Sequence, residues 1–222
     1  MMADKGDSMS TIAVIGVTGY AGGHIAAEAL RRGHEVIGVS RTSPTNSQSG
    51  LSVQSGDVTD ETLIRSIVAR ASVLVIAVHS TVDNTPFLAQ LVPSLLEAAG
   101  TSGTRIGFVG GAGSLLVAPD GPRLVDTPEF PEMFKNEAEA LADVLETLRA
   151  SNSTTDWFYL SPAAGFGAYA PGERTGKYRT GDNILLTDAE GNSFISGADY
   201  AIAFVDEIEK PRHHQQRFSV AY

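Results

Sequence analysis

The sequence predicts one α/β domain built on a mostly parallel, doubly wound sheet, and two observations support that prediction. Residues 11–41 read as a strand, a glycine-rich turn, a helix and a second strand, which is the unit that opens such a sheet. Short apolar runs then alternate with helical patterns along the rest of the chain, as a parallel sheet with crossover helices requires. At 222 residues the chain is long enough for one such domain with a substantial core.

The glycine-rich turn predicts a site for the pyrophosphate of a dinucleotide. Gly16, Gly19 and Gly22 follow an apolar run and precede a helical stripe of apolar residues. The first glycine permits the tight turn, the second lets the backbone approach the phosphates, and the third allows close packing of helix on strand. The N–H groups at the helix start then face the anion; the alternative is that the glycines only permit a sharp bend. The intervening residues assigned to the cofactor are Thr18, Tyr20 and Ala21.

The remaining elements follow from the same alternation of apolar runs and helical stripes. We expect strands at residues 35–41, 51–54, 72–78, 105–109, 157–160 and 217–222. We expect helices at 60–69, with Thr59 or Asp60 as the cap, and at 84–99, 132–150 and 199–209. Residues 184–186 and 193–195 flank a turn and predict a hairpin.

The chain divides into a short start and one folded domain. Residues 1–10 are polar and are expected to be disordered, and the polar loop at 42–50 is expected to be mobile. Residues 11–222 are expected to form a single Rossmann-like, dinucleotide-binding domain. Within it, residues 163–197 are expected to form much of a small C-terminal substrate lobe, because ligands bind at the carboxyl ends of parallel strands.

Composition excludes several kinds of protein. The chain has no cysteine, which excludes disulfides, thiol chemistry and cysteine-bound metals. A formal net charge of −10 argues against a nucleic-acid partner, and the five histidines form no metal-binding pattern. No apolar run is long enough to span a membrane, and the start lacks a signal-peptide core. We therefore expect a cytoplasmic protein, monomeric or homodimeric, that binds neither membrane nor metal.

The end of the second strand favours NADP(H) over NAD(H). Proteins that select NAD usually place an acid there, but this strand ends in Ser40 and Arg41. A guanidinium suits a 2′-phosphate because its fork pairs with phosphate oxygens; the alternative is a solvated arginine. Asp57 and Val58 close the third strand, where the carboxylate can accept a hydrogen bond from the adenine amino group or cap a helix.

The ends of the central strands complete the expected dinucleotide site. Small or apolar residues there let the backbone pass close to the cofactor. His79 is expected to contact the ribose or the backbone, with a functional histidine as the alternative. The residues assigned are Ala77, Val78, His79, Gly110, Gly111, Ala112, Ser161, Pro162 and Ala163.

Four segments together resemble a known family. They are the opening glycine motif, GDVTD at 56–60, FVGGAGSL at 108–115, and the run from SPAAGF at 161–166 through PGERTGKYRTG at 171–181. In these segments the chain is similar to the NAD(P)H–flavin reductases, which are atypical short-chain dehydrogenase/reductase proteins, and also to biliverdin-IXβ reductase and the NmrA-like proteins. The resemblance covers residues 11–222 and implies an NAD(P)H-dependent reductase with a Rossmann-like fold.

The chain departs from typical short-chain dehydrogenases at the proton relay. Those enzymes use a serine after the fifth strand and a Tyr-x-x-x-Lys motif on the next helix. If Lys135 is that lysine, Pro131 stands in the tyrosine position. The serine position falls near Ala112, with Ser114 two residues further on. Lys135 is assigned to the nicotinamide ribose and, with Ser114, to catalysis; the alternative for Lys135 is an exposed helix lysine.

The missing relay fits hydride transfer to a flavin, a quinone or a similar planar acceptor, with flavin as a substrate and not a tightly bound cofactor. A flavin delocalises the added charge, so the protein mainly stacks the acceptor and excludes water. Phe166, Tyr169 and Tyr178 are candidates for the walls of this site. Arg174 is a candidate for charge stabilisation or a phosphate contact, and is included among the catalytic residues. Each aromatic is alternatively a core residue, and Arg174 an ion-pair residue.

Two other functions stay open. A dinucleotide-binding sensor without turnover, of the NmrA-like type, would also lack the proton relay. An epimerase or dehydratase of nucleotide sugars is less favoured, because those enzymes need that relay.

Overall fold

The computed structural model describes residues 9–42 and 49–222. Residues 1–8 of the expected disordered start, and residues 43–48 of the expected mobile loop, lie outside the described residues. At the start of the described chain, the Glu35 N–H donates to the Ser10 carbonyl at 3.1 Å. This bond ties the beginning of the described chain to the sheet.

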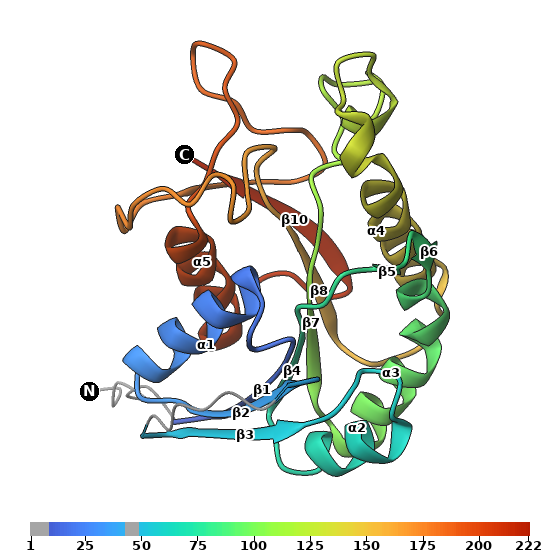
Figure 1. Cartoon of the computed structure of the whole chain (residues 1–222), viewed down its shortest axis with the longest axis vertical. Coiled ribbons are helices and arrows are strands. Elements are labelled where there is room, and N and C mark those ends of the chain that lie inside the picture. Colours follow the sequence, from blue (N-terminus) through green and yellow to red (C-terminus); the bar gives the residue numbers. More distant parts are fainter. Residues whose placement is uncertain (1–8, 43–48) are drawn as a thin grey trace, which may run out of the picture.

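The described chain folds around an eight-stranded sheet in which every neighbouring pair but one is parallel (Figure 1). The order is β3-β2-β1-β4-β7-β8-β10-β9, and β9 at the edge is the antiparallel strand. The bounds are β1 Thr11–Ile15, β2 Glu35–Ser40, β3 Leu51–Ser55, β4 Val73–Ile76, β7 Arg105–Val109, β8 Trp157–Ser161, β9 Arg179–Gly181 and β10 Gln216–Ala221. The order reverses between β1 and β4, so the carboxyl ends of these two strands form the switch point where ligands bind in such sheets.

Helices cover both faces of the sheet, as a doubly wound fold requires. Their bounds are α1 Tyr20–Arg31, α2 Glu61–Val68, α3 Leu88–Ser102, α4 Glu132–Ala150 and α5 Gly197–Glu209, with a 3₁₀ turn at Leu124–Asp126. α1 and α5 pack together on one face, and α2, α3 and α4 cover the other (Figure 1). The expected Rossmann-like fold is therefore confirmed.

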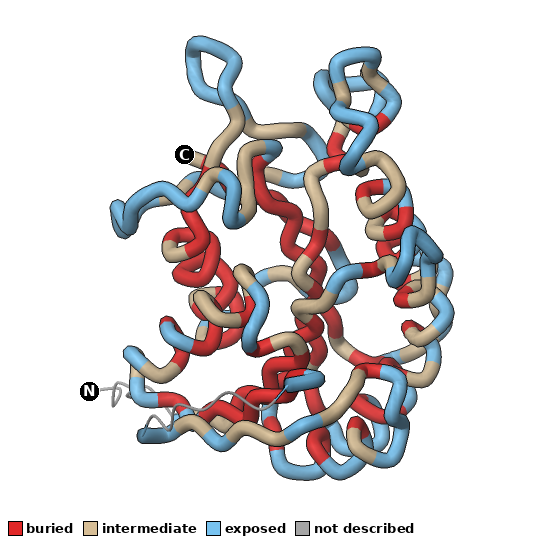
Figure 2. Tube along the Cα trace, in the orientation of Figure 1, coloured by how far each residue is buried: buried red, intermediate tan, exposed pale blue. Residues whose placement is uncertain are grey.

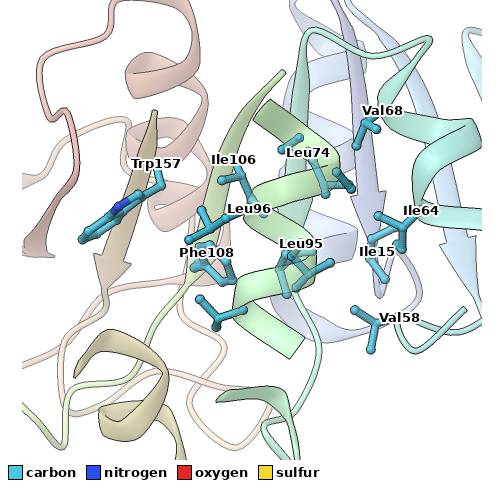
Figure 3. Packing of buried hydrophobic residues seen from close by; sticks show 14 of the residues in the cluster. Ile15, Val58, Ile64, Val68, Leu74, Leu95, Leu96, Ile106, Phe108 and Trp157 are labelled. Carbon is cyan, nitrogen blue, oxygen red and sulfur yellow. The ribbon is translucent and has the colours of Figure 1, made fainter. Parts of the chain in front are cut away.

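The core lies in two layers, one on each face of the central strands (Figure 2). Along β1, Ala13 and Ile15 join the layer under α2, α3 and α4, because successive strand residues point to opposite faces. β4 is buried along its whole length, which explains why its sequence VLVI is apolar on both faces. Figure 3 shows Ile64 of α2 beside Ile15, at the end of β1 that leads into the glycine turn. Core packing thus fixes the strand ends from which the site is built.

Most of the other expected elements are confirmed to within two residues at each end. Asp60 caps α2, because its carboxylate accepts the Leu63 N–H at 3.0 Å. Ser196 caps α5, which begins at Gly197, by accepting the Asp199 N–H at 3.1 Å. Short polar side chains therefore mark the starts of α2 and α5, as expected for N-cap residues.

The helix expected at 84–99 begins later than predicted, at Leu88. Residues 81–86 form a short hairpin instead, with β5 at Thr81–Val82 and β6 at Thr85–Pro86. The turn residues Asp83 and Asn84 have φ values of +48° and +59°. Left-handed backbone at both positions suits a tight hairpin turn and excludes a right-handed helix.

The hairpin expected from residues 184–186 and 193–195 is wrong. The turn between them does form, and the Asp188 carboxylate accepts two of its backbone N–H groups. The flanking residues pair elsewhere, however: Ile184 forms a bridge with Leu116. Phe194 forms a bridge with Gly165. These segments therefore join loops that follow β7 and β8.

Candidate functional site

The turn after β1 is packed too tightly for side chains. Gly16 has a φ of +89°, and a Cβ there would lie 2.2 Å from the Ala77 carbonyl oxygen just beyond β4. A Cβ on Gly22 in α1 would lie 2.2 Å from the Gly16 carbonyl oxygen. Both separations are shorter than real Cβ contacts. The first and third glycines therefore hold the start of α1 against the switch point, as the sequence predicts.

The geometry at the start of α1 would suit an anion. Its N-cap, Gly19, makes no side-chain hydrogen bond, and no acidic residue lies in this described first turn. The N–H groups of Tyr20, Ala21 and Gly22 have no acceptor one turn earlier in the helix. The exposed Thr18 precedes them. The pyrophosphate of a dinucleotide would suit this helix start, because its N–H groups are donors and the helix dipole is positive there.

Arg41 lies at the end of β2, next to this turn. The last residues of β2 contact the turn directly, since the Val39 carbonyl accepts the Gly16 N–H at 2.8 Å. Ser40 is buried, and its hydroxyl donates to the Thr42 carbonyl. Arg41 is exposed. This strand end therefore offers a guanidinium beside the anion site, where the sequence predicts a 2′-phosphate contact.

Asp57 and Val58 follow β3. The Asp57 carboxylate accepts hydrogen bonds from the N–H and the hydroxyl of Thr59, at 3.0 and 2.8 Å. It thus closes a turn before α2, while the helix cap itself is Asp60. Val58 is buried in the core, so its backbone is the part that can reach a cofactor. The adenine contact of Asp57 stays a prediction.

Glu137 of α4 holds the loop after β4. Its carboxylate accepts hydrogen bonds from the backbone N–H groups of Ser80 and Thr81, at 2.7 and 3.1 Å, and from the Thr81 hydroxyl at 2.6 Å. Burial disfavours its charge, but these bonds and the contact with His79 bring the pKa of Glu137 down to about 2. The loop that carries Ala77, Val78 and His79 is therefore anchored across the site by a carboxylate.

His79 is the exposed partner of this carboxylate. Its Nδ1 lies 3.5 Å from a Glu137 oxygen, and its side chain is 89% exposed. The hydrogen bond to Glu137 raises the pKa of His79, against the opposing effects of burial and of the Arg41 charge. A histidine favoured in its charged form thus joins Arg41 on the side of the site assigned to the dinucleotide.

Tyr159 fixes the backbone after β7. A Cβ on Gly110 would lie 2.1 Å from the Tyr159 ring, so the glycine makes room for that ring. The Tyr159 hydroxyl accepts the Gly111 N–H at 3.2 Å and donates to the Leu141 carbonyl of α4 at 3.0 Å. The segment that continues through Ala112 is therefore set by the buried ring beneath it.

Arg217 of β10 is a functional candidate that the sequence reasoning missed. Its guanidinium is buried and donates to the Asn183 side-chain oxygen from Nε and Nη2, at 2.9 and 2.7 Å. Its Nη1 donates to the hydroxyls of Ser114 and Ser161, at 3.2 and 3.5 Å. Burial lowers the pKa of Arg217 to about 10. Because each hydroxyl accepts from the cation, its own proton is left to donate to another group. The residues that follow Ser161, Pro162 and Ala163, are buried.

The first turn of α4 places Lys135 near the site without a tyrosine beside it. Pro131, in the expected tyrosine position, is the N-cap of α4. Lys135 is partly exposed. A hydrogen bond from Arg123 lowers the pKa of Asp126, and the charge of Lys135 contributes to the same shift. The lysine therefore lies on the carboxyl side of the sheet, and its contact with a ribose stays a prediction.

No tyrosine hydroxyl in the described chain, which includes all six tyrosines, is left as a free proton donor. Each donates to an oxygen of the protein itself. The acceptors are Pro171 for Tyr20, Leu141 for Tyr159, Ala164 for Tyr169, Asp206 for Tyr178, Leu160 for Tyr200 and, among others, Asp199 for Tyr222. In this structure, therefore, no tyrosine hydroxyl is set as the donor of a proton relay, and Pro131 stands in the tyrosine position of the motif.

The segment after β8 brings two of the four predicted acceptor residues to the site. Phe166 packs edge-on against the Tyr20 ring at the start of α1, with ring centroids 5.4 Å apart. Tyr169 stacks with Phe134 of α4, with centroids 5.6 Å apart and planes at 21°. One short segment therefore reaches from α1 to α4 above the carboxyl ends of the strands.

Arg174 and Tyr178 are held by side chains of α1 and α5 instead. Arg174 pairs with Glu28 of α1 at 3.2 Å, and Glu28 lies two turns, or about 12 Å, along that helix from its start. The Tyr178 hydroxyl donates to Asp206 of α5. Neither side chain contacts the candidate site in this structure, and their roles toward an acceptor stay predictions.

Asp199 fixes the second part of the same segment, and the sequence reasoning did not single it out. This fully buried carboxylate accepts hydrogen bonds from the Thr175 N–H and hydroxyl, at 2.8 and 2.7 Å. It also accepts the Gly176 N–H at 2.8 Å and the Tyr222 hydroxyl at 2.5 Å. These bonds outweigh the effect of burial and lower the pKa of Asp199.

The described residues contain no group of three or more histidine, aspartate or glutamate side chains that could hold a metal ion. His213 and His214 pair with different carboxylates, Glu207 at 2.7 Å and Asp156 at 2.9 Å. Within the same part of the chain, no helix is both long and apolar enough to cross a membrane.

Comparisons with known proteins agree with a dinucleotide site. A family model described as NAD(P)H-binding matches residues 16–211. A solved structure from Burkholderia pseudomallei, provisionally named an exported protein, is 41% identical, with a TM-score of 0.80 over 96% of this chain and 100% of its own. One from Bacteroides thetaiotaomicron, provisionally named an epimerase, is 35% identical, with a TM-score of 0.85 over 97% and 98%. One from Streptococcus pneumoniae TIGR4, provisionally named an NADH-flavin reductase, is 35% identical, with a TM-score of 0.79 over 96% and 99%.

Proposed function

Because the chain belongs to the NAD(P)H-binding family, we propose that it is a reductase that passes hydride from NADPH to a flavin, a quinone or a similar planar acceptor. An NAD(P)H-dependent oxidoreductase is the general class that the family match and the fold support. The planar acceptor, the preference for NADP(H) and the use of flavin as a substrate are the finer parts of the proposal.

The absence of a free tyrosine hydroxyl carries the choice of acceptor. Reduction of a ketone places a full charge on one oxygen, which must be protonated by a nearby donor. All six tyrosine hydroxyls already donate within the protein, and Pro131 occupies the relay position. A flavin or a quinone spreads the added charge over a conjugated ring. Such an acceptor needs stacking, dry surroundings and hydrogen-bond donors more than a tyrosine proton.

Each part of the site has a task in this proposal. When bound, NADPH supplies a hydride from its nicotinamide ring, and the acceptor takes the electron pair with that hydrogen while the nicotinamide is oxidised. The turn at residues 16–22 holds the pyrophosphate, and Arg41 holds the 2′-phosphate. Ser114, accepting from buried Arg217, directs its proton toward negative charge on the reduced acceptor. The segment after β8 covers the acceptor and excludes water.

Steady-state oxidation of NADPH and NADH by purified protein tests the proposal, with FMN, FAD, riboflavin and a simple quinone as acceptors. We expect saturable turnover with at least one planar acceptor and a lower KM for NADPH. A preference for NADH would overturn the role of Arg41 and leave the reductase standing. Tight binding of the dinucleotide without turnover on any acceptor would favour a regulatory sensor of the NmrA-like type.

One similar protein is provisionally named an epimerase, but we do not propose epimerase activity for this chain. An epimerase of nucleotide sugars needs a proton relay at the sugar, and the tyrosine of such a relay is replaced by Pro131 in this chain. The cytoplasmic location expected from the sequence also stays a proposal, and one similar protein carries the name of an exported protein.

A further inference from the structure

Two exposed aromatic rings meet above the carboxyl ends of the central strands. Phe134 comes from the first turn of α4, and Tyr169 comes from the segment after β8. Their ring centroids are 5.6 Å apart and their planes differ by 21°, so the rings lie nearly parallel. Phe134 is 40% exposed and Tyr169 is 63% exposed. Each ring therefore packs against the other and keeps part of its surface in contact with water.

The backbone around Tyr169 is shaped to hold this ring. Gly167 has a φ of +147°, and a Cβ there would lie 2.7 Å from a carbon of the Tyr169 ring. The Tyr169 hydroxyl donates to the Ala164 carbonyl at 3.3 Å, which folds the ring back over its own loop. A side chain at 167 would push the ring away from Phe134. The exposed position of the ring is therefore built into the loop.

The surroundings of the pair are apolar and exposed. Among the large apolar side chains exposed in the described chain, Met133 is 82% exposed next to Phe134, and Val82 is 49% exposed on the β5–β6 hairpin. The hairpin is joined to α4 because the Asn136 amide donates to the Asn84 carbonyl at 2.6 Å. The ring pair is therefore accompanied by other exposed apolar side chains on α4 and on the hairpin that is bonded to it.

We propose that Phe134 and Tyr169 form an aromatic clamp, in which one end of the flat conjugated electron acceptor inserts between the two side chains while its reacting part stays open to the nicotinamide. This rests on the proposed function and names the subsite that selects its acceptor. Insertion of a ring requires the two planes to stand about 7 Å apart, twice an aromatic contact distance. The rings are already nearly parallel, so they need to separate without turning. Opening therefore requires Tyr169 to give up its hydrogen bond to Ala164 and move outward, while α4 holds Phe134 in place.

The clamp is tested by the binding of riboflavin to the protein in the presence of NADP⁺, followed by quenching of riboflavin fluorescence. This measurement needs no turnover. The variants are Phe134→Leu and Tyr169→Ala, which remove one ring each. The matched controls are Tyr169→Phe, which keeps the ring, and Met133→Ala, which removes an exposed apolar side chain next to Phe134.

We expect each ring-removing variant to raise the riboflavin Kd about 10-fold and each control to stay within about twofold. The Kd for NADPH, measured on the same proteins, is expected to be unchanged, which shows that the variants fold. An unchanged riboflavin Kd in both Phe134→Leu and Tyr169→Ala overturns the clamp, as does the absence of saturable quenching with the native chain. Riboflavin binding that depends on both rings but gives no turnover keeps the clamp and overturns the reductase. Turnover with a riboflavin KM that is unchanged in both variants keeps the reductase and overturns the clamp.

Discussion

The starts of α1 and α5 lie side by side at the same end of the sheet, but their first turns are completed differently. They touch directly, since the Gly197 N–H donates to the Tyr20 hydroxyl at 2.9 Å. In α5, Ser196 caps the helix and the Asp199 carboxylate lies in the first turn. In α1, Gly19 makes no side-chain cap and the described first turn holds no acid. The start of α5 is completed by side-chain oxygens of the protein, whereas the start of α1 has no side-chain cap and is the proposed anion site.

This difference separates the site into two halves with different origins. The proposed dinucleotide half, around α1, is made mainly by backbone N–H groups and by glycines that let the backbone pack closely. The acceptor half, around α5 and α4, is made by loops that side chains such as Asp199 hold together. Changes at α1 should therefore act mainly on binding, and changes at α5 mainly on stability.

The largest effect is expected from Gly22→Ala. The new methyl group would lie 2.2 Å from the Gly16 carbonyl oxygen, so α1 must move away from the turn. We expect the Kd for NADPH to rise more than about 100-fold, and the free energy of unfolding to fall by about 2 kcal/mol. Gly23→Ala is the matched control, because its Cβ would lie 3.4 Å from the nearest atom. If Gly23→Ala weakens binding as strongly, the close approach at Gly22 is not the cause.

At α5, Asp199→Asn should destabilise the fold by about 2–3 kcal/mol in urea unfolding near neutral pH. An amide offers one acceptor oxygen to the donors that now bind two carboxylate oxygens, and it turns its own N–H groups toward them. The pKa of Asp199 is lowered in the folded state, so its contribution is present above its unfolded value near 3.8 and is lost as pH falls through the folded value. The two proteins should therefore converge in stability as pH falls below 3.8 and through the lowered pKa of Asp199. A difference that stays constant with pH would contradict this assignment.

Arg41→Gln sharpens the comparison within the dinucleotide half. The guanidinium is exposed and holds no part of the core, so stability should stay unchanged. We expect the Kd for NADPH to rise about 10-fold, because a charged pair with the 2′-phosphate is lost. Binding of NADH serves as the internal control and should stay the same. Equal losses for both dinucleotides would place Arg41 at another phosphate.

The smallest effect is expected from Asp60→Ala at the start of α2. Loss of the hydrogen bond to the Leu63 N–H should lower the free energy of unfolding by about 1 kcal/mol. The Kd for NADPH, followed by NADPH fluorescence, should not change, because in the native protein a side chain already caps the start of α2. A loss of affinity would show that this helix start also faces the dinucleotide.

The turn and helix of the proposed dinucleotide half could be predicted from the sequence, because their signals are local. The spacing of Gly16, Gly19 and Gly22 after an apolar run fixes both the turn and the helix that follows. The cap of α2 was visible for the same reason, since Asp60 directly precedes the helix. In each case the residues that contact one another lie within a few positions in the chain.

The acceptor half could not be predicted in detail, because its contacts join distant segments. Ile184 pairs with Leu116, so a segment beside the predicted hairpin turn has its partner elsewhere in the chain. Tyr169 was assigned to the acceptor from composition, but its partner Phe134 lies on another helix. Arg217 carried no signal beyond a single charge in an apolar strand. Such pairs become visible when the loops are placed in space.

Direct transfer of hydride from NADPH in one half to the acceptor in the other is tested most directly by an anaerobic single-turnover experiment. Excess protein loaded with NADPH is mixed with FMN, and the loss of the visible absorbance of oxidised FMN is followed in time. We expect the FMN absorbance to bleach at a rate that saturates with protein concentration and far exceeds the rate without protein. Full occupancy by NADPH with bleaching no faster than in the protein-free mixture, for FMN and for a quinone alike, would contradict it.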